Sequence, residues 1–514
     1  MSDKKKLDCL FLVAKSSSKT YQKLSVTYSA IEPPTWALLL AQSTRSIGFE
    51  VGIIDANAED INEKEILEKI KKFSPKIICF VVYGQNVNAG TTNMSGAVFL
   101  ANFLKKNINT PISIIGSHVQ ALPKETLKQE KSIDFVFTNE GVYALRNILK
   151  LKKFTSDELA KVKGIAYRNN NKIQINEPEQ IVPNDKMDID LPGYAWDLLP
   201  FKNQPLDLYR APMWHAEYDF EKRSPYASLQ TSLGCQFGCN FCMINIINRN
   251  DNDEIGVASN YSKMRFWSPD FIIKEFDKLI KMGVRTIRIV DEMFLLNPKY
   301  YIPLCEKLAE RNKDDSLRIW SYSRIDTVKR PEILELVRKA GIKWLALGIE
   351  SGDKAVRLEV DKGKFEDVDV QKVIDRVHQA DINVMANYIY GLPGDTNETI
   401  KKTFELSLKL CTAGWNTYGA MALPGSYLYK KALEDGVKLP DSYEGYSFHS
   451  YETLPLPTET LSAKEVITLR DEAFDKYHNH KPFLNLIEKK FGKKAAENIV
   501  EMTKIKLKRK IKGD

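Results

Sequence analysis

The chain has 514 residues, a formal net charge of +8, and a composition that is 43% hydrophobic and 28% charged. This length predicts two or three domains, and the composition is typical of a globular protein rather than a disordered or fibrous one. No apolar run approaches the ~20 residues that a membrane-spanning helix needs, so no transmembrane segment is expected.

The seven cysteines lack the spacing of a disulfide framework, which favours a reducing, cytoplasmic location. The run Lys504–Lys512 carries six cations in nine residues and is expected to be a solvated, partly disordered end. The rest of the chain is then close to neutral. Its charge therefore gives no reason to expect a nucleic-acid partner.

Residues 1–150 are predicted to form a doubly wound, Rossmann- or flavodoxin-like domain. Short apolar strands alternate there with helical stretches, which is typical of a parallel sheet covered on both faces. Ligands of such sheets bind outside the carboxyl ends of the strands, where the loops gather. The expected strands are Cys9–Ala14, Val51–Asp55, Ile77–Tyr83, Ile112–Gly116 and Phe135–Thr138.

Residues 151–225 are predicted to be a connector. Within them Lys163–Arg168 and Lys172–Ile175 flank Asn169-Asn170-Asn171, which indicates a hairpin. Prolines punctuate the remainder, as in segments that wrap over a surface.

A second βα series occupies residues 226–424 and predicts a partial parallel barrel of six strands. Parallel barrels carry their chemistry at the carboxyl ends of the strands. Residues 425–514 are predicted to be mainly helical and to end in the basic tail. The expected barrel strands are Ala227–Ser232, Thr286–Val290, Arg318–Ser321, Trp344–Leu347, Asn383–Tyr390 and Asn416–Met421.

Three cysteines, Cys235, Cys239 and Cys242, follow the first of these strands in a C-x3-C-x2-C pattern. A structural zinc site needs a fourth ligand, and the nearest candidates, His215 and Cys305, are distant in sequence. Three thiolates suit an iron–sulfur cluster, which would keep one iron open for a small molecule. The pattern therefore favours a metal ligand set over buried core cysteines.

Polar residues also stand at the ends of the later strands. Asp291 and Glu292 follow the second strand, where an N-cap followed by a first-turn acid is the alternative interpretation. Arg324 follows the third strand and could fork onto a carboxylate or pair with Asp326. Glu350 ends the fourth strand, and its two oxygens could accept two hydroxyls.

These strings resemble the radical S-adenosylmethionine (SAM) enzymes, in particular Gly-Ile-Glu-Ser-Gly at 348–352 and the cysteine spacing. The resemblance implies a [4Fe–4S] cluster on the three cysteines, whose open iron chelates the amino and carboxylate groups of SAM. It also implies SAM contacts from four strand ends: Asp291 or Glu292 to the amino group, Arg324 to the carboxylate, Glu350 with Ser351 to the ribose, and Gly391 along the adenine.

The N-terminal part is similar to the cobalamin-binding domains that precede some radical SAM barrels, as in Gly116-Ser117-His118 and Asn139-Glu140-Gly141. The D-x-H-x-x-G signature, which places a histidine below cobalt, is absent. The resemblance therefore implies cobalamin without a histidine ligand, with the Tyr83–Asn88 loop, rather than His118, near its lower face. The cobalamin contacts expected are Ser17, Tyr83, Gly84, Gln85, Gly116, Ser117, His118, Glu140 and Gly141.

The whole pattern looks like a class B radical SAM methyltransferase. Such an enzyme abstracts hydrogen from an unactivated carbon with a 5′-deoxyadenosyl radical and transfers a methyl group from methylcobalamin. It would act on a small-molecule or biosynthetic-intermediate substrate and take electrons from a donor such as flavodoxin or ferredoxin. Ring contraction, oxidative cyclisation, or a non-catalytic cobalamin- or cluster-binding role stays open, and no residue was found to identify the catalytic group or the substrate.

Overall fold

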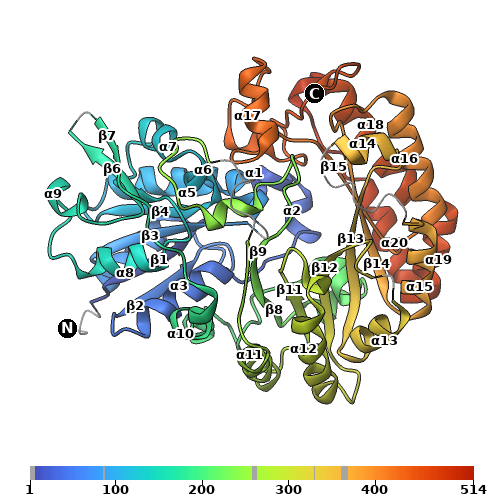
Figure 1. Cartoon of the computed structure of the whole chain (residues 1–514), viewed down its shortest axis with the longest axis horizontal. Coiled ribbons are helices and arrows are strands. Elements are labelled where there is room, and N and C mark those ends of the chain that lie inside the picture. The colour runs from blue at the N-terminus through green and yellow to red at the C-terminus, as the bar shows by residue number, and fades with distance from the viewer. Residues whose placement is uncertain (1–5, 85–86, 171, 257–262, 329, 360–367) are drawn as a thin grey trace.

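A computed structural model describes residues 6–84, 87–170, 172–256, 263–328, 330–359 and 368–514. Two sheets lie side by side, an N-terminal one in blue to teal and a barrel sheet in green to orange (Figure 1). One large hydrophobic core runs through both parts, from Phe11 in the first sheet to Ile287 in the second. The two parts are therefore packed against one another rather than joined by a loose linker.

The N-terminal sheet has seven strands in the order β2-β1-β3-β4-β5-β6-β7 among the described residues. The first five are parallel, and Cys9 in the central region lies opposite both Val51 and Ile77. The strands are β1 Cys9–Val13, β2 Val51–Asp55, β3 Ile77–Val82, β4 Ile112–Gly116, β5 Phe135–Phe137, β6 Ile165–Asn169 and β7 Lys172–Ile175.

Helices cover both faces of this sheet because its strands are apolar on both sides. In β1, Phe11 packs into the core that contains α3 and α8, whereas Leu10 packs into the core that contains α4, α5 and α7. The helices are α1 Ser17–Tyr21, α2 Leu24–Thr27, α3 Thr35–Arg45, α4 Glu63–Phe73, α5 Gly90–Lys105, α6 Ser117–Ala121, α7 Pro123–Gln129, α8 Val142–Lys150, α9 Ser156–Leu159 and α10 Met187–Asp190.

The predicted connector contributes two strands to this sheet. β6 and β7 form the expected hairpin, and β6 pairs antiparallel with β5, Phe135 lying opposite Tyr167. The N-terminal sheet thus extends to Ile175, past the boundary predicted at residue 150. Pairing with the hairpin covers the open edge of β5, which would otherwise present unpaired backbone groups.

The second sheet is the predicted half-barrel, with six parallel strands in the order β15-β14-β13-β12-β11-β8. Its helices lie along its outer side (Figure 1). The strands are β8 Tyr226–Leu229, β11 Thr286–Ile289, β12 Arg318–Arg324, β13 Ile342–Glu350, β14 Asn383–Tyr390 and β15 Gly414–Gly419, and the helices are α11 Pro269–Lys281, α12 Pro298–Arg311, α13 Pro331–Lys339, α14 Lys354–Glu359, α15 Val370–Gln379 and α16 Asn397–Leu410.

The C-terminal region carries four helices and then returns to the N-terminal part. These are α17 Tyr427–Glu434, α18 Ala463–His478, α19 Lys481–Phe491 and α20 Lys493–Thr503. Between α17 and α18 a short helical turn, Tyr443–Tyr446, packs on α5. Across the described residues, no helix combines the length and apolar character that crossing a membrane requires.

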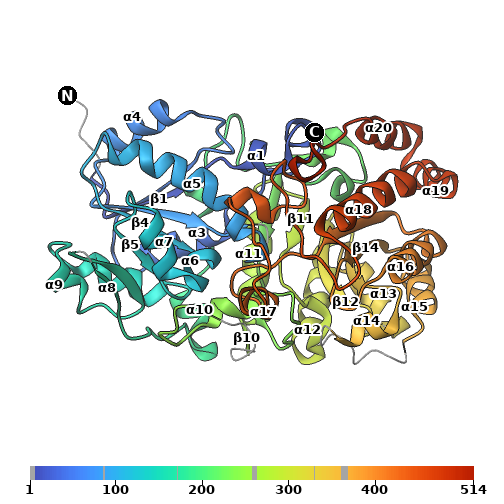
Figure 2. The same cartoon turned by 90° about the horizontal axis from the view of Figure 1, so that it is seen from above.

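The basic tail is ordered against the protein, so the expectation of a solvated, partly disordered end is wrong at Arg509. This side chain is fully buried and donates to both carboxylate oxygens of Asp471 and to Ser450 O. Lys508 bonds through its backbone to the Gln22 side chain just after α1, and Figure 2 shows the C-terminus beside α1. The ion pair between the buried Arg509 and Asp471 fixes the segment. The number of cations in the sequence gives no indication of this pair.

Candidate functional site

The three cysteines lie in the loop that follows the first barrel strand. After β8 the chain forms β9, Ser232–Cys235, which pairs antiparallel with β10, Lys263–Phe266. Cys235 is therefore buried at the end of a strand, and Cys239 and Cys242 are half-buried in the next turn. The Cys242 N–H donates to Cys239 O at 3.0 Å, which closes that turn. The sequence did not predict this two-stranded sheet.

The spacing of the three cysteine side chains bears on the metal group that they could hold. No three Cys, His, Asp or Glu side chains in the described part of the chain lie close enough together to hold one metal ion. In a cubane cluster each thiolate binds a different iron, so its ligands stand farther apart. Burial raises the pKa of Cys242, and the charges of Glu292, Cys239 and Cys235 raise it further. A soft, cationic group is needed to hold such thiols as thiolates.

Asp291 holds the turn that leads into the cysteine loop. Its Oδ1 accepts the Thr231 N–H at 2.6 Å, and its Oδ2 accepts the hydroxyls of Thr231 at 2.5 Å and Ser232 at 2.7 Å. Burial raises the pKa of this carboxyl to about 6, although the three hydrogen bonds act against that shift. With both oxygens engaged, Asp291 positions the loop. Of the predicted pair, Glu292 is the residue whose charge acts on Cys242.

Arg324 is the last residue of β12 and lies against the cysteine loop. Its guanidinium carbon stands 3.9 Å from the centre of the Phe237 ring, between Cys235 and Cys239 in sequence. Nε and Nη2 donate to the two oxygens of Asp326 at 2.9 and 3.2 Å. The salt bridge considered from the sequence is thus formed, and it orients the guanidinium beside the loop.

Glu350 ends β13 in a strained conformation. Its φ of +64° is left-handed, which is uncommon for a residue other than glycine, and the pairing with β14 shifts register there. The side chain is buried. Such strain is often retained at functional sites. The hydroxyl of the next residue, Ser351, lies 3.1 Å from Thr403 Oγ1 and accepts the Asp353 N–H, which fixes its position.

Gly391 follows β14 where no larger residue fits. Its φ is +80°, and a Cβ there would lie 2.7 Å from Val466 Cγ1. Its N–H donates to Asp395 Oδ2 at 3.0 Å. Burial raises the pKa of Asp395 to about 6. The backbone at Gly391 is therefore held close to its surroundings, as the predicted contact along adenine requires.

The carboxyl edge of the N-terminal sheet is built around close backbone approaches. A Cβ at Gly116 would lie 2.2 Å from Val82 O, and one at Gly90 would lie 2.0 Å from Ser117 Oγ. The ends of β3 and β4 and the start of α5 therefore meet at glycines. Loops of this kind offer backbone groups and hydroxyls, rather than charges, to a ligand.

Aromatic and neutral side chains line the same edge. Tyr83 stacks on Trp36 with the ring centres 4.9 Å apart, and its hydroxyl accepts from Gln120 at 2.5 Å. His118 Nδ1 lies 3.2 Å from Thr91 Oγ1, and its ring meets Tyr443 edge-on. Burial lowers the pKa of His118 to about 4, so its imidazole is neutral.

The remaining predicted cobalamin contacts lie in different surroundings, some at the carboxyl edge of the sheet and some among buried hydrogen bonds. Ser17 Oγ donates to Asn57 Oδ1 at 3.4 Å. A Cβ added at Gly84 would lie 2.2 Å from the Cβ of Ala89. Glu140 is a framework residue: its oxygens accept from Val182 N and from Arg265 Nη2, each at 2.6 Å. The neighbouring Gly141 is left-handed, with φ +76°. Gln85 lies outside the described residues.

The two edges meet through contacts that the sequence did not predict. Asn88 Nδ2, in the turn Val87–Ala89 after β3, donates to Cys242 Sγ at 3.7 Å. Glu32, ahead of α3, pairs with Arg288 of β11 at 2.5 Å, with both side chains buried. Arg288 also donates to Tyr322 OH at 2.6 Å. An acid in a loop of one domain and a base within a strand of the other give no local signal of pairing.

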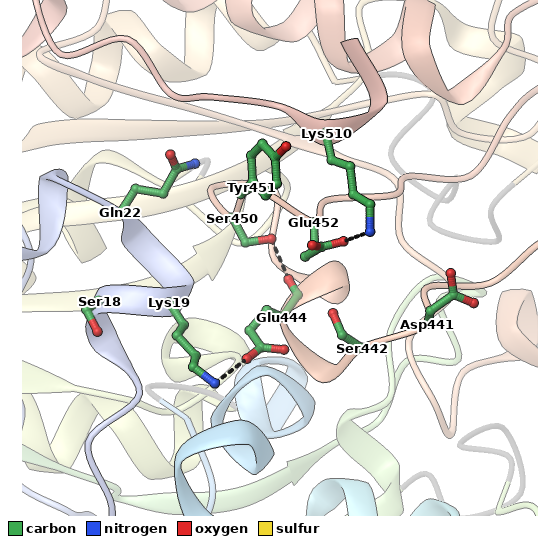
Figure 3. Close-up of a pocket in the computed structure, with 10 residues that line it drawn as sticks. All are labelled: Ser18, Lys19, Gln22, Asp441, Ser442, Glu444, Ser450, Tyr451, Glu452 and Lys510. Carbon is green, nitrogen blue, oxygen red and sulfur yellow. Dashed lines mark hydrogen bonds and ion pairs between the residues drawn. The ribbon is translucent and has the colours of Figure 1, made fainter. Parts of the chain in front are cut away.

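A pocket of about 490 Å³ lies outside this junction (Figure 3). Two ion pairs cross it, Lys19 with Glu444 at 3.3 Å and Lys510 with Glu452 at 2.8 Å. Ser18 and Lys19 of α1 line the pocket, whereas Tyr21 of the same helix lies near Glu32, and burial followed by that charge raises the pKa of Tyr21 to about 12. Its lining residues are Ser18, Lys19, Gln22, Asp441, Ser442, Glu444, Ser450, Tyr451, Glu452 and Lys510.

Two family models match the two sheets. The B12 binding domain matches residues 22–149, and the radical SAM superfamily matches residues 229–407. The chain therefore carries a B12-binding domain ahead of a radical SAM domain. The first domain implies cobalamin, and the second implies a [4Fe–4S] cluster and SAM.

Two relatives align with most of the chain. An uncharacterized methyltransferase of Pyrococcus horikoshii is 27% identical over 423 residues, 81% of this chain and 82% of the relative. An anaerobic magnesium-protoporphyrin IX monomethyl ester cyclase of Cereibacter sphaeroides is 24% identical, over 85% of this chain and 65% of the relative.

A solved structure shares the fold. The radical SAM methyltransferase TsrM of Kitasatospora setae, with cobalamin and a [4Fe–4S] cluster bound, superposes with a TM-score of 0.62 at 15% identity and covers 92% of this chain and 88% of its own. This chain thus shares the fold of that methyltransferase over nearly its whole length.

Proposed function

We propose that this enzyme transfers a methyl group from SAM to an unactivated carbon of a small-molecule substrate. The observation that carries the proposal is the contact between the two edges, Asn88 with Cys242 at 3.7 Å. A loop at the cobalamin edge touches the cysteine loop of the barrel. A substrate between the two edges would therefore be within reach of both cofactors, which is the proximity that such a reaction needs.

The residues divide into ligands, SAM contacts and supports. Cys235, Cys239 and Cys242 would ligate the cluster. When bound, cluster and SAM supply a carbon radical, and cobalamin supplies the methyl group. The SAM contacts proposed are Glu292, Arg324, Glu350, Ser351 and Gly391, with Asp291 holding the loop in place.

On the cobalamin side the proposed contacts are Ser17, Tyr83, Gly84, Gln85, Gly116, Ser117, His118 and Gly141, with Glu140 as a support. The close fits at Gly116 and Gly84 support an edge shaped for a large ligand. We propose that this domain reaches Ile175, that the barrel occupies residues 226–424, and that residues 425–514 cover their junction.

Oxidative cyclisation is the second candidate, because the relative from Cereibacter sphaeroides is a cyclase aligned over 85% of this chain. Incubation of reduced, reconstituted enzyme with methyl-labelled SAM and candidate substrates distinguishes methyl transfer from oxidative cyclisation. Label in the product supports methyl transfer. Formation of 5′-deoxyadenosine with an unlabelled, oxidised product would instead establish the cyclase reaction.

The enzyme needs a one-electron donor, and we propose a flavodoxin or ferredoxin. No disulfide joins cysteines among the described residues. An oxygen-sensitive cluster favours a reducing compartment, the cytoplasm. Reconstitution with purified flavodoxin, followed by 5′-deoxyadenosine formation, tests the donor.

A further inference from the structure

The amide of Asn88 contacts the cysteine loop through both of its ends. Its Nδ2 donates to Cys242 Sγ at 3.7 Å, and its Oδ1 accepts the Met243 N–H at 3.1 Å and lies 3.9 Å from the same sulfur. The same sulfur also accepts the Ile244 N–H at 3.5 Å. One side chain of the B12-binding domain therefore holds both the sulfur of Cys242 and the backbone directly after it.

The loop that carries Asn88 is itself fixed to the carboxyl edge of the B12-binding domain. Thr92 Oγ1 of α5 donates to Ala89 O at 2.8 Å, and Asn93 Nδ2 donates to Tyr83 O at 3.4 Å. At the other end of the loop, Gly84 packs against Ala89. A displacement of this edge would therefore move Asn88.

We propose that Asn88 is a positioning residue through which the B12-binding domain orients Cys242 and tunes the reduction potential of the cluster. The inference rests on the proposed role of Cys242 as a ligand. An N–H donor to a ligating sulfur stabilises the more negative, reduced cluster and so raises its potential. The acceptor end of the same amide holds the backbone that follows the ligand.

Two substitutions separate the two ends of the amide. Asn88→Asp keeps an acceptor for Met243 but places an anion beside the sulfur, so the cluster potential should shift to more negative values. Asn88→Ala removes both contacts, so the potential should shift in the same direction by less, and the Met243 amide should exchange hydrogen faster than in wild type. Potentials are measured by dye-mediated titration of the reconstituted full-length protein with paramagnetic resonance detection, and exchange by mass spectrometry.

Asn57→Asp is the matched control, since Asn57 lies at the same domain edge, contacts Ser17 and takes part in no hydrogen bond to the cysteine loop that is seen in the described residues. It should leave both readouts unchanged. An unchanged potential in Asn88→Asp, or unchanged Met243 exchange in Asn88→Ala, overturns the proposal. If Asn88→Ala holds no cluster, the exchange measurement on its cluster-free form, against cluster-free wild type, still decides it. Full iron in Cys242→Ala would instead refute the ligand assignment, and missing methyl label would refute only the proposed reaction.

Discussion

The two parallel sheets carry their sites at the same kind of edge but build them from different chemistry. At the edge of the B12-binding domain, Gly116 and Gly90 bring backbone groups together, and the nearby His118 is neutral. At the barrel edge the strand ends carry thiols and charges, among them Arg324 and Glu350. One edge is suited to a large ligand held by shape and backbone, and the other to a metal cluster and a charged cosubstrate.

The difference shows that architecture places a site without deciding its chemistry. Even the corresponding carboxyls play similar structural roles: Asp55 ends β2 and accepts from Tyr209 OH, Asn57 N and Ala58 N, while Asp291 follows β11 and accepts from Thr231 and Ser232. What differs is the set of side chains that faces the ligand. Apart from Asn88, which contacts the cysteine loop, substitutions at one edge should therefore spare the cofactor of the other.

Loss of any one ligand should produce the largest effect. Cys235→Ala, Cys239→Ala or Cys242→Ala should abolish the cluster and SAM cleavage, because three thiolates are the minimum set. Cobalamin binding should persist, since it belongs to the other edge. Iron content, 5′-deoxyadenosine yield and cobalamin absorbance measure this. Cys305→Ala, in a buried site on α12, is the control, and near-normal iron in a motif variant would contradict the assignment.

Gly116→Ala should give the opposite pattern. The added Cβ would lie 2.2 Å from Val82 O, so β3 and β4 must separate at the ligand edge. Overpacking of this kind costs about 1–3 kcal/mol, and we expect cobalamin affinity to fall by about tenfold or more with iron content unchanged. Equilibrium titration with hydroxocobalamin measures it. Gly48→Asn, at an open left-handed position in the same domain, should retain wild-type affinity.

The two buried carboxyls should make stability depend on pH at both edges. Burial raises the pKa of Asp55 and of Asp291 from 3.8 to about 6. A raised acid pKa means that the folded state binds the proton more tightly, so stability falls as pH rises from about 4 to about 6 and is constant above that. Asp55→Asn or Asp291→Asn should remove up to about 3 kcal/mol of this dependence. Thermal melting of each variant across that pH range checks it, and slopes equal to wild type would contradict it.

His118→Ala should have the smallest effect on cobalt. His118 is neutral, with Nδ1 next to Thr91 and its ring against Tyr443. We expect the paramagnetic resonance spectrum of Co(II) cobalamin to lack axial nitrogen splitting both before and after the substitution. Nitrogen splitting that disappears in the variant would show that this histidine binds the metal.

Local patterns predicted most of the fold. The strand ends of the N-terminal sheet agree to within a residue, for example at β2 and β4, because continuous apolar runs and the turns after them are local signals. The same holds for β14, whereas β12 and β13 run on into the strings predicted to be loops. Their polar ends, Arg324 and Glu350, interrupt the apolar pattern although the backbone stays in the sheet.

The contacts that the sequence did not predict join residues that are far apart along the chain. Asn88 and Cys242 are 154 residues apart, and Arg265 and Glu140 are 125 apart. Neither the type of each residue nor the sequence next to it indicates these contacts. Only the tertiary fold brings the buried Glu140 to Arg265 and makes Asn88 a neighbour of the cysteine loop.

The contact of the C-terminal segment with the first domain sets the order in which parts of this protein can fold during synthesis. The sheet that ends at Ile175 can fold while the barrel is still being translated, because domains generally fold as units from the N-terminus. The contact between Gln22 and Lys508, however, joins residues 486 positions apart. The surface around α1 must therefore wait for nearly the whole chain before Arg509 reaches Asp471. Until then the first domain is folded but still lacks its final covering.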